Sequence, residues 1–242
     1  MATRGEIRNR LPLQEIDERP KKWRKYPHLF LIVCEDEKTE PLYFKKFKEI
    51  FNNIYPKETV FLCLVGTGRN SKGVVEQAII KKKELFEESN KTVDETWVVF
   101  DKDDLEQSEG NRQRFMDAFE IAEKENINIA YSNEVFELWF LLHFANINSK
   151  QPIPRSDIFA KLEEKIKKHP PYSDFVYEHG KSDIVDIVLK IGNEKRAIER
   201  ADRINSEHET KKNQPIDANP NTRVNILVKR LRALIAYYSY EL

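Results

Sequence analysis

The sequence predicts an α/β fold in which helices cover both faces of a mainly parallel central sheet, followed by a mostly helical C-terminal part. The chain has 242 residues, of which 40% are hydrophobic, so it is long enough to bury a sizeable core. Short apolar runs alternate with segments in which apolar residues recur at helical spacing. The runs are apolar throughout rather than at every second position, which is typical of parallel strands buried on both faces.

The expected elements of the first part alternate between strand and helix. In order, they are strand 29–34, helix 40–55, strand 59–65, helix 74–88, strand 97–100, helix 112–125 and strand 127–131. Pro41 suits the first turn of its helix, where a backbone donor is not needed. Right-handed crossovers would bring the carboxyl ends of the parallel strands to one edge of the sheet, where open α/β sheets bind ligands.

The next segment, SNEVFELWFLLHF, predicts a helix with Ser132 or Asn133 as its N-cap. Patterning in the rest of the chain is less regular. Helices are expected within 152–168 and over 184–190, 195–206 and 224–240, and a loop is expected over 169–183. Thr222 is a candidate cap for the last helix.

The chain is expected to have three regions. Residues 1–27 form a basic N-terminal arm, with eight basic and four acidic side chains, which is either a solvated tail or an arm that binds a partner or nucleic acid. Residues 28–150 form the α/β domain. Residues 151–242 form a mostly helical region that packs on it.

Composition excludes some classes of protein. The 41 basic and 41 acidic side chains balance, which argues against a strongly basic protein that coats nucleic acid. Both cysteines lie in apolar runs, as expected for reduced thiols of a cytoplasmic protein. No apolar run approaches 18 residues and the N-terminus lacks a signal-peptide pattern, so we expect neither membrane spanning nor secretion.

Acidic side chains follow two of the expected strands at the point where each strand ends. Glu35 and Asp101 come directly after the last apolar residue, and Asp103 can point to the same side as Asp101 because the strand period is two. Crowded carboxylates repel each other, and a divalent cation removes that repulsion. Mg²⁺, or Mn²⁺, suits such oxygen ligands. The competing interpretation is that these acids are helix caps and solvated turn residues.

Several residues near these acids are candidates for substrate binding: Lys38, Glu40, Arg69, Asn70 and Lys102. The lysines either contact a phosphate or belong to solvated turns. Glu40 is either a further carboxylate of the site or a residue that interacts with its helix dipole. The segment GTGRNSKG, 66–73, either receives a phosphate on its backbone amides or is an ordinary connection. It lacks the Lys-Ser/Thr of a P-loop, so nucleoside-triphosphate hydrolysis by this chain is not expected.

Further substrate-binding candidates lie later in the chain: Asn133, Glu137, His143 and Lys181. A lone Glu or His within an aromatic helix is more often a hydrogen-bonded core group, so Glu137 and His143 each have two interpretations. Lys181 belongs to the 169–183 loop together with Tyr177 and His179. These three side chains reach the acidic edge only if the loop folds back over it.

A strand that ends in Glu, followed by a strand that ends in Asp-x-Asp, resembles the Toprim domain shared by topoisomerases, primases and OLD-type nucleases. Within this group the chain is most similar to the RloB-like proteins associated with phage defence. That family's CEGEKTE…YF, FDrDD, SNPxFElWlllHF and NPsTxvxxLV appear here as CEDEKTEPLYF (34–44), FDKDD (100–104), SNEVFELWFLLHF (132–144) and NPNTRVNILV (219–228). Two positions differ, because Asp36 stands where the family usually has Gly and Glu134 where Pro is common.

The resemblance implies a Toprim-like fold and phosphodiester chemistry. Asp101 and Asp103 would ligate Mg²⁺, and Glu35 would ligate a metal or move a proton. No tyrosine is clearly placed for a covalent step, so water is the simpler nucleophile. The implied protein is a nuclease that hydrolyses RNA, with tRNA preferred, or DNA, and acts as a toxic effector in prokaryotic antiviral defence. It further implies an ATPase as a partner protein.

Two alternatives remain open from the sequence. One is a catalytically silent module that docks on an ATPase or binds a nucleotide signal, and Asp36 in place of glycine favours it because it adds negative charge beside Glu35. The other is primase-like nucleotidyl transfer, which uses similar carboxylates. The sequence also leaves open whether the chain forms a homo-oligomer.

Overall fold

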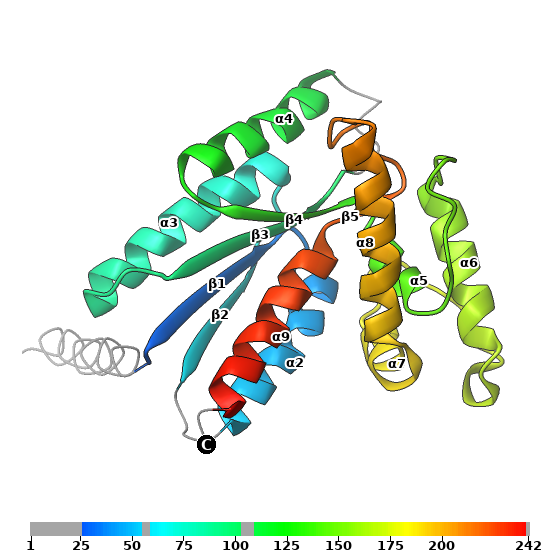
Figure 1. The fold of residues 1–242 in the computed structure, drawn as a ribbon, viewed down its shortest axis with the longest axis horizontal. Helices are drawn as coiled ribbons and strands as arrows, with labels where there is room; N and C mark the ends of the chain where they lie inside the picture. Colours follow the sequence, from blue (N-terminus) through cyan, green and yellow to red (C-terminus); the bar gives the residue numbers. More distant parts are fainter. Residues whose placement is uncertain (1–25, 55–58, 103–108, 241–242) are drawn as a thin grey trace, which may run out of the picture.

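The computed structural model describes residues 26–54, 59–102 and 109–240. Within these ranges, helices flank a five-stranded sheet in the order β2–β1–β3–β4–β5 (Figure 1). The strands are β1 (His28–Cys34), β2 (Val60–Gly66), β3 (Glu95–Asp101), β4 (Asn128–Asn133) and β5 (Asn221–Thr222). The predicted α/β class is confirmed. Nearly all of the expected N-terminal arm, 1–27, lies outside the described residues.

The sheet is mainly parallel, as predicted. β1 pairs in parallel with both β2 and β3, and β3 pairs in parallel with β4. The short β5 is antiparallel to β4 and was not expected, because NPNT had been interpreted only as the start of a helix. Thr222 serves both elements, since it pairs in β5 and its hydroxyl oxygen accepts a hydrogen bond from the Val224 amide at 3.3 Å.

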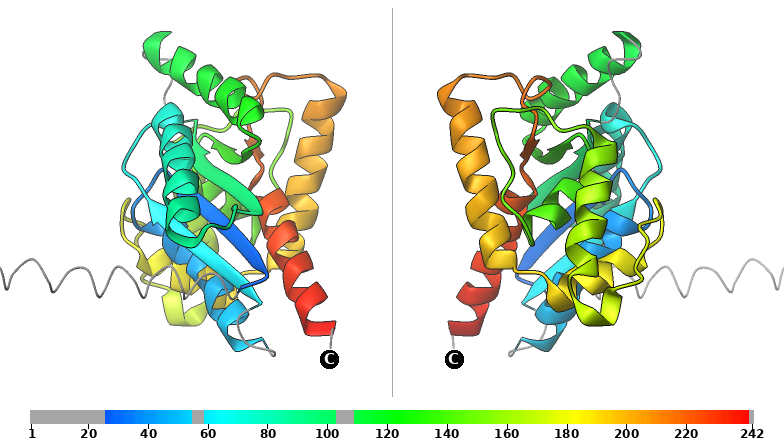
Figure 2. Two further views of the ribbon diagram at one scale, coloured as in Figure 1. Left: turned by 90° about the vertical axis from the view of Figure 1, so that its left-hand side faces the viewer. Right: turned by 90° about the vertical axis from the view of Figure 1, so that its right-hand side faces the viewer.

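The helices fall on the two faces of the sheet (Figures 1 and 2). They are α2 (Thr39–Asn53), α3 (Ser71–Ser89), α4 (Glu109–Lys124), α5 (Glu137–Leu142), α6 (Arg155–Lys167), α7 (Asp183–Ile191), α8 (Glu194–Thr210) and α9 (Val224–Tyr240), with a 3₁₀ turn η2 (Pro170–Tyr172). Figures 1 and 2 show α3 and α4 on one face and α2 and α9 on the other.

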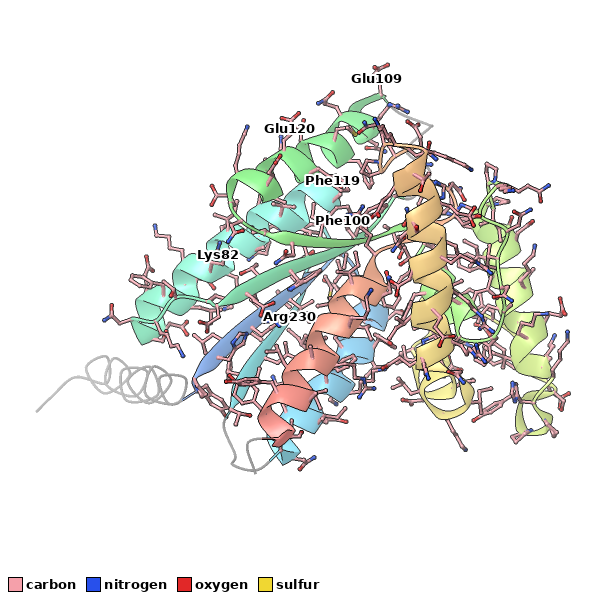
Figure 3. All side chains as sticks on the ribbon, in the orientation of Figure 1. Lys82, Phe100, Glu109, Phe119, Glu120 and Arg230 are labelled. Atoms are coloured by element: carbon pink, nitrogen blue, oxygen red, sulfur yellow. The ribbon has the colours of Figure 1, made fainter. Side chains whose placement is uncertain are left out.

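Successive residues of the central strands enter two separate cores. In β3, Val98 and Phe100 join the cluster under α3 and α4, whereas Val99 joins the cluster under α2 and the C-terminal helices. Phe100 packs on Phe119 of α4 with ring centroids 5.9 Å apart, and both rings are labelled in Figure 3. Because both faces are covered, every position between the two ends of β3 is buried, which explains the uninterrupted apolar runs in the sequence.

The C-terminal helices share a core with the sheet. Buried side chains of four helices, Leu162 in α6, Val188 in α7, Ile204 in α8 and Leu227 in α9, belong to the same cluster as Val99. The region after residue 150 therefore packs directly on the α2 face of the sheet. Among the described residues, no helix combines the length and apolar character needed to cross a bilayer. Cys34 is buried, Cys63 is half-buried, and neither forms a disulfide.

One carboxylate joins three helices on this face. Glu194 at the start of α8 accepts hydrogen bonds from Lys46 of α2 at 2.7 Å and from Arg232 of α9 at 2.6 Å. The Lys46 ammonium also lies 4.1 Å from the centroid of the Tyr43 ring. Burial lowers the pKa of Lys46 and is opposed by the charge of Glu194. The carboxylate therefore compensates two neighbouring cations.

We expect Glu194→Gln to lower the free energy of unfolding by about 2 kcal/mol, because Lys46 and Arg232 would remain close together without their shared anion. Urea denaturation followed by circular dichroism would measure the change. The matched control is Glu199→Gln in the same helix, whose exposed pair with Arg196 predicts a loss of at most about 0.5 kcal/mol. Equal losses in the two variants would contradict the structural role given to Glu194.

The segment 132–144 differs from its predicted form. It was expected to be one helix capped by Ser132 or Asn133, but these residues end β4 and pair with Thr222 and Asn221 of β5. The Ser132 and Thr222 hydroxyl oxygens lie 3.0 Å apart. The predicted N-cap is therefore wrong, because pairing with a distant segment keeps Ser132 and Asn133 extended. The helix in this motif is limited to the short α5.

Candidate active site

The carboxyl ends of β1 and β3 lie side by side and bring two predicted acids together. Glu35 follows β1 directly, and its Oε2 accepts a hydrogen bond from the backbone amide of Asp101 at 2.8 Å. Its own amide donates to the Val99 carbonyl at 2.9 Å. The expected meeting of these two strand ends is confirmed for Glu35 and Asp101. The third predicted acid, Asp103, lies outside the described residues.

Asp101 is also held from the opposite side by the aromatic motif. Its Oδ2 accepts a hydrogen bond from the backbone amide of Phe136 at 3.0 Å. Phe136 immediately precedes α5, and its side chain is buried. Two chain segments thus fix Asp101: β3, which supplies the residue, and the α5 entrance, which orients its carboxylate.

The turn between β1 and α2 is built by further carboxylates. Asp36 accepts a hydrogen bond from the Thr39 amide at 2.5 Å, and Glu40 accepts one from the Asp36 amide at 3.2 Å. Asp36 therefore satisfies a donor at the first turn of α2, as Asp commonly does. Sequence reasoning did not assign this role to Asp36.

Asp36 does not need the backbone freedom of the glycine usual at this position in the family it resembles. Among the described residues, the non-glycine residues with positive φ are Asn90, Asn126 and Lys212. The turn is further held by the β2–α3 connection, where the amide of Gly68 donates to the Glu35 carbonyl at 2.8 Å. An aspartate is therefore compatible with a turn that presents Glu35 to Asp101.

These residues line a pocket of about 190 Å³. Its walls contain five carboxylate side chains, namely Glu35, Asp36, Glu40, Asp101 and Glu137. Burial raises the pKa of Glu40 well above its usual value, and the charge of Glu35 raises it further. Burial likewise raises the pKa of Glu137, although a hydrogen bond from Tyr177 opposes the shift. Because like charges crowded together repel, such a pocket favours a bound cation or proton.

The 169–183 loop folds back over this pocket. This is the condition under which its side chains were expected to reach the acidic edge. The Tyr177 hydroxyl donates to Glu137 Oε1 at 2.5 Å, and the Tyr177 ring stacks on Phe159 of α6 with centroids 4.7 Å apart. His179 and Gly180 contribute to the pocket wall. Lys181, the substrate-binding candidate in this loop, is exposed, pairs with Glu178 at 2.6 Å and does not line the pocket.

Two other candidates hold the scaffold behind the site. The buried Lys102 ammonium lies 3.4 Å from Glu134 Oε1, which also accepts a hydrogen bond from Asn219 Nδ2 at 2.7 Å. Asn133 is fully buried and donates to the carbonyl of Ile216 at 3.3 Å. Glu134, at a position where the related family commonly has Pro, therefore links β3 to the NPNT motif. Neither Lys102 nor Asn133 lines the acidic pocket.

The remaining candidates do not line the acidic pocket. His143 is buried beside Trp139, with ring centroids 5.1 Å apart, and burial lowers its pKa to about 3. It therefore has a core placement, as in one of its two interpretations, but neither ring nitrogen has the expected hydrogen-bond partner among the described residues. Asn70 caps α3 by accepting a hydrogen bond from the Gly73 amide at 3.0 Å. Arg69 beside it is exposed. Lys38 is exposed at the start of α2 and lines a second cavity.

The donor atoms of the pocket fit a hard divalent cation. All of its acidic groups are carboxylates, and Mg²⁺ or Mn²⁺ prefers such oxygen ligands. Within 26–54, 59–102 and 109–240, no three His, Cys, Asp or Glu side chains are already arranged around one metal position. Glu35 and Asp101 would therefore supply part of a ligand set, and the predicted third ligand, Asp103, belongs to a segment that the structure does not describe.

Comparison with known proteins gives one family. The family model described as "RloB-like protein" matches residues 30–231, which include every pocket-lining residue. No curated protein matches the chain significantly. No solved structure does so either.

Proposed function

The chain belongs to the RloB-like family, and from this premise we infer that its acidic pocket is the active site of a metal-dependent nuclease. The observation that supports the proposal most is the hydrogen bond between Glu35 and the Asp101 backbone, which joins two strand ends in a pocket lined by five carboxylates. Such a pocket suits a divalent cation and a phosphate better than an apolar ligand. The proposed reaction is hydrolysis of a phosphodiester bond with water as the nucleophile.

The side chains have distinct tasks in this proposal. Asp101 and Glu35, together with Asp103, would hold Mg²⁺, which when bound stabilises negative charge on a non-bridging phosphate oxygen. The backbone amides of Asp101 and Phe136 keep the two carboxylates oriented. Glu40 is buried, with 2% of its surface exposed, and its raised pKa suits it to hold a proton and deliver it to the leaving oxygen.

Three further features of the proposal rest on family membership rather than on the pocket. We propose that the substrate is RNA rather than DNA, with tRNA as the preferred RNA. We also propose that the enzyme acts in the cytoplasm as a toxic effector of prokaryotic antiviral defence. An ATPase is the proposed partner. The alternative of a silent binding module drew on Asp36, whose carboxylate accepts a hydrogen bond from the Thr39 amide in a turn where Glu35 and Asp101 still meet.

The test is to sequence the ends of total RNA and total DNA from cells that express the wild-type protein or the Asp101→Ala variant. We expect new RNA ends in the wild-type cells alone. In vitro, the same cleavage should require Mg²⁺ or Mn²⁺, stop on addition of EDTA and resume when excess metal is restored. Identical ends in the two cell populations would overturn the nuclease proposal, and nucleotide incorporation instead of cleavage would indicate primase-like transfer.

A further inference from the structure

A second cavity lies beside the acidic pocket, on the outward side of α2. It has a volume of about 520 Å³ and an apolar floor formed by Pro41, Leu42 and Leu64. Three lysines, Lys38, Lys45 and Lys48, surround this floor, together with one acid, Glu37, and Ser182. The cavity therefore combines an apolar base with a predominantly positive rim, whereas the neighbouring pocket is acidic.

The lysines form one stripe along α2. Lys38, Lys45 and Lys48 are separated by seven and three residues, a spacing that places side chains on the same face of a helix. Ten residues at a rise of about 1.5 Å per residue give the stripe a length of about 15 Å. This length corresponds to about four stacked nucleotides at a rise of about 3.4 Å.

The stripe carries unbalanced positive charge. Within the part of the chain that the structure describes, neither Lys38 nor Lys48 forms an ion pair, and Lys45 has only a long contact of 3.9 Å with the exposed Glu49. The Lys48 ammonium also lies 6.0 Å from the centroid of the Phe61 ring. This face therefore attracts anions more strongly than the balanced net charge of the chain indicates.

The cavity and the acidic pocket are lined by neighbouring residues of the sequence. Glu37 and Lys38, which line the cavity, lie between Asp36 and Thr39, which line the acidic pocket. The 169–183 loop also borders both sites, because its Gly180 lines the acidic pocket and its Ser182 lines the second cavity. A nucleic-acid strand with one phosphate among the carboxylates would therefore continue onto the lysine stripe.

We propose that this cavity binds an unpaired segment of the nucleic-acid substrate, next to the phosphate that is cleaved. The inference rests on the proposed nuclease function and names the surface that holds the substrate. The three ammonium groups contact phosphates along this segment, and a base or ribose covers the apolar floor. An unpaired strand fits because its bases can turn into a cavity, whereas the bases of a duplex are already stacked and paired.

The test is to measure the binding of a fluorescent single-stranded oligouridylate by anisotropy, in Mg²⁺ and in an Asp101→Asn background that prevents cleavage. We expect the triple substitution Lys38→Gln, Lys45→Gln and Lys48→Gln to weaken binding roughly 100-fold at about 0.1 M salt. The slope of log affinity against log salt should fall by about 2, because each lost phosphate contact on a single strand removes about 0.7. The three side chains are exposed or half-buried, so folding should be retained.

The matched control removes three lysines from the opposite side of the sheet. Lys82→Gln, Lys83→Gln and Lys124→Gln change the charge equally on α3 and α4, and Figure 3 labels Lys82 on α3, across the sheet from α2. We expect less than a threefold change in affinity for this control. Equal weakening in the two triple variants would overturn the proposal, as would duplex RNA that binds as tightly as the single strand.

The result separates this inference from the proposed nuclease function. Binding is measured without cleavage, so a lysine-dependent single-strand affinity would support the inference even in a protein that cuts nothing. Conversely, metal-dependent cleavage together with unchanged affinity in the Lys38, Lys45 and Lys48 variant would leave the nuclease proposal intact and overturn the inference. In that case an acidic protein segment would be the next occupant to test on this face.

Discussion

Asp101→Asn should abolish metal-dependent cleavage while leaving the protein folded. Asparagine can still accept the hydrogen bond from the Phe136 amide, which the Asp101 carboxylate accepts at 3.0 Å. It lacks the negative charge that a divalent cation needs. Loss of a metal ligand removes several kcal/mol of charge stabilisation in the transition state, and each 1.36 kcal/mol is worth about tenfold in rate. We therefore expect cleavage to fall by about 10³-fold or more.

Single-turnover cleavage with saturating Mg²⁺ would measure this loss, and the unfolding midpoint would report on the fold. Glu35→Gln should behave similarly, since glutamine can still accept from the Asp101 amide. Asp117→Asn is the matched control, because Asp117 is a half-buried carboxylate of α4 that pairs with Lys72 at 2.9 Å and does not line the pocket. If Asp101→Asn retained cleavage like the Asp117 variant, the chemistry would have to lie elsewhere in the molecule.

The order of elements in the sheet could be predicted from the sequence because it depends on local patterns. Each strand of the parallel part is a continuous apolar run, and each run is separated from the next by a helical segment. β5 could not be predicted in this way, because it has only two residues and its partner Ser132 is ninety positions earlier in the chain. The same distant pairing explains why Ser132 and Asn133 are extended although the residues around them have helical spacing.

The site, like the sheet, has features that local patterns predict and features that depend on distant contacts. Glu35 and Asp101 were predictable because an acid at a strand end must lie on the carboxyl edge, whatever the helices do. The contact between Tyr177 and Glu137 depends on how a long loop closes, which no local pattern specifies. Glu137 and His143 belong to the same aromatic motif, yet Glu137 lines the pocket and His143 faces Gly192 in the core. Their spacing alone did not distinguish them.

Gly66→Ala should damage both stability and cleavage, because the end of β2 presses against the turn that carries Glu35. A Cβ atom at Gly66 would lie 2.7 Å from the Cα of Glu37 and 2.9 Å from the carbonyl oxygen of Asp36. Backbone atoms at these distances must move. We expect a loss of about 2 kcal/mol in the free energy of unfolding from overpacking. Displacement of the neighbouring Glu35 carboxylate by about 1 Å would reduce cleavage by about 10²-fold.

Gly192→Ala separates the two effects, because it creates a similar clash at a residue that does not line the acidic pocket. A Cβ atom there would lie 2.5 Å from the Val188 carbonyl oxygen and 2.7 Å from His143 Nδ1. We expect a comparable fall in the unfolding midpoint, with cleavage unchanged below the transition. Cleavage assays and thermal unfolding of the two variants, at a temperature where both are folded, would decide between a local and a general cause. Equal losses of cleavage would show that the fit between Gly66 and the Glu35 turn has no special part in catalysis.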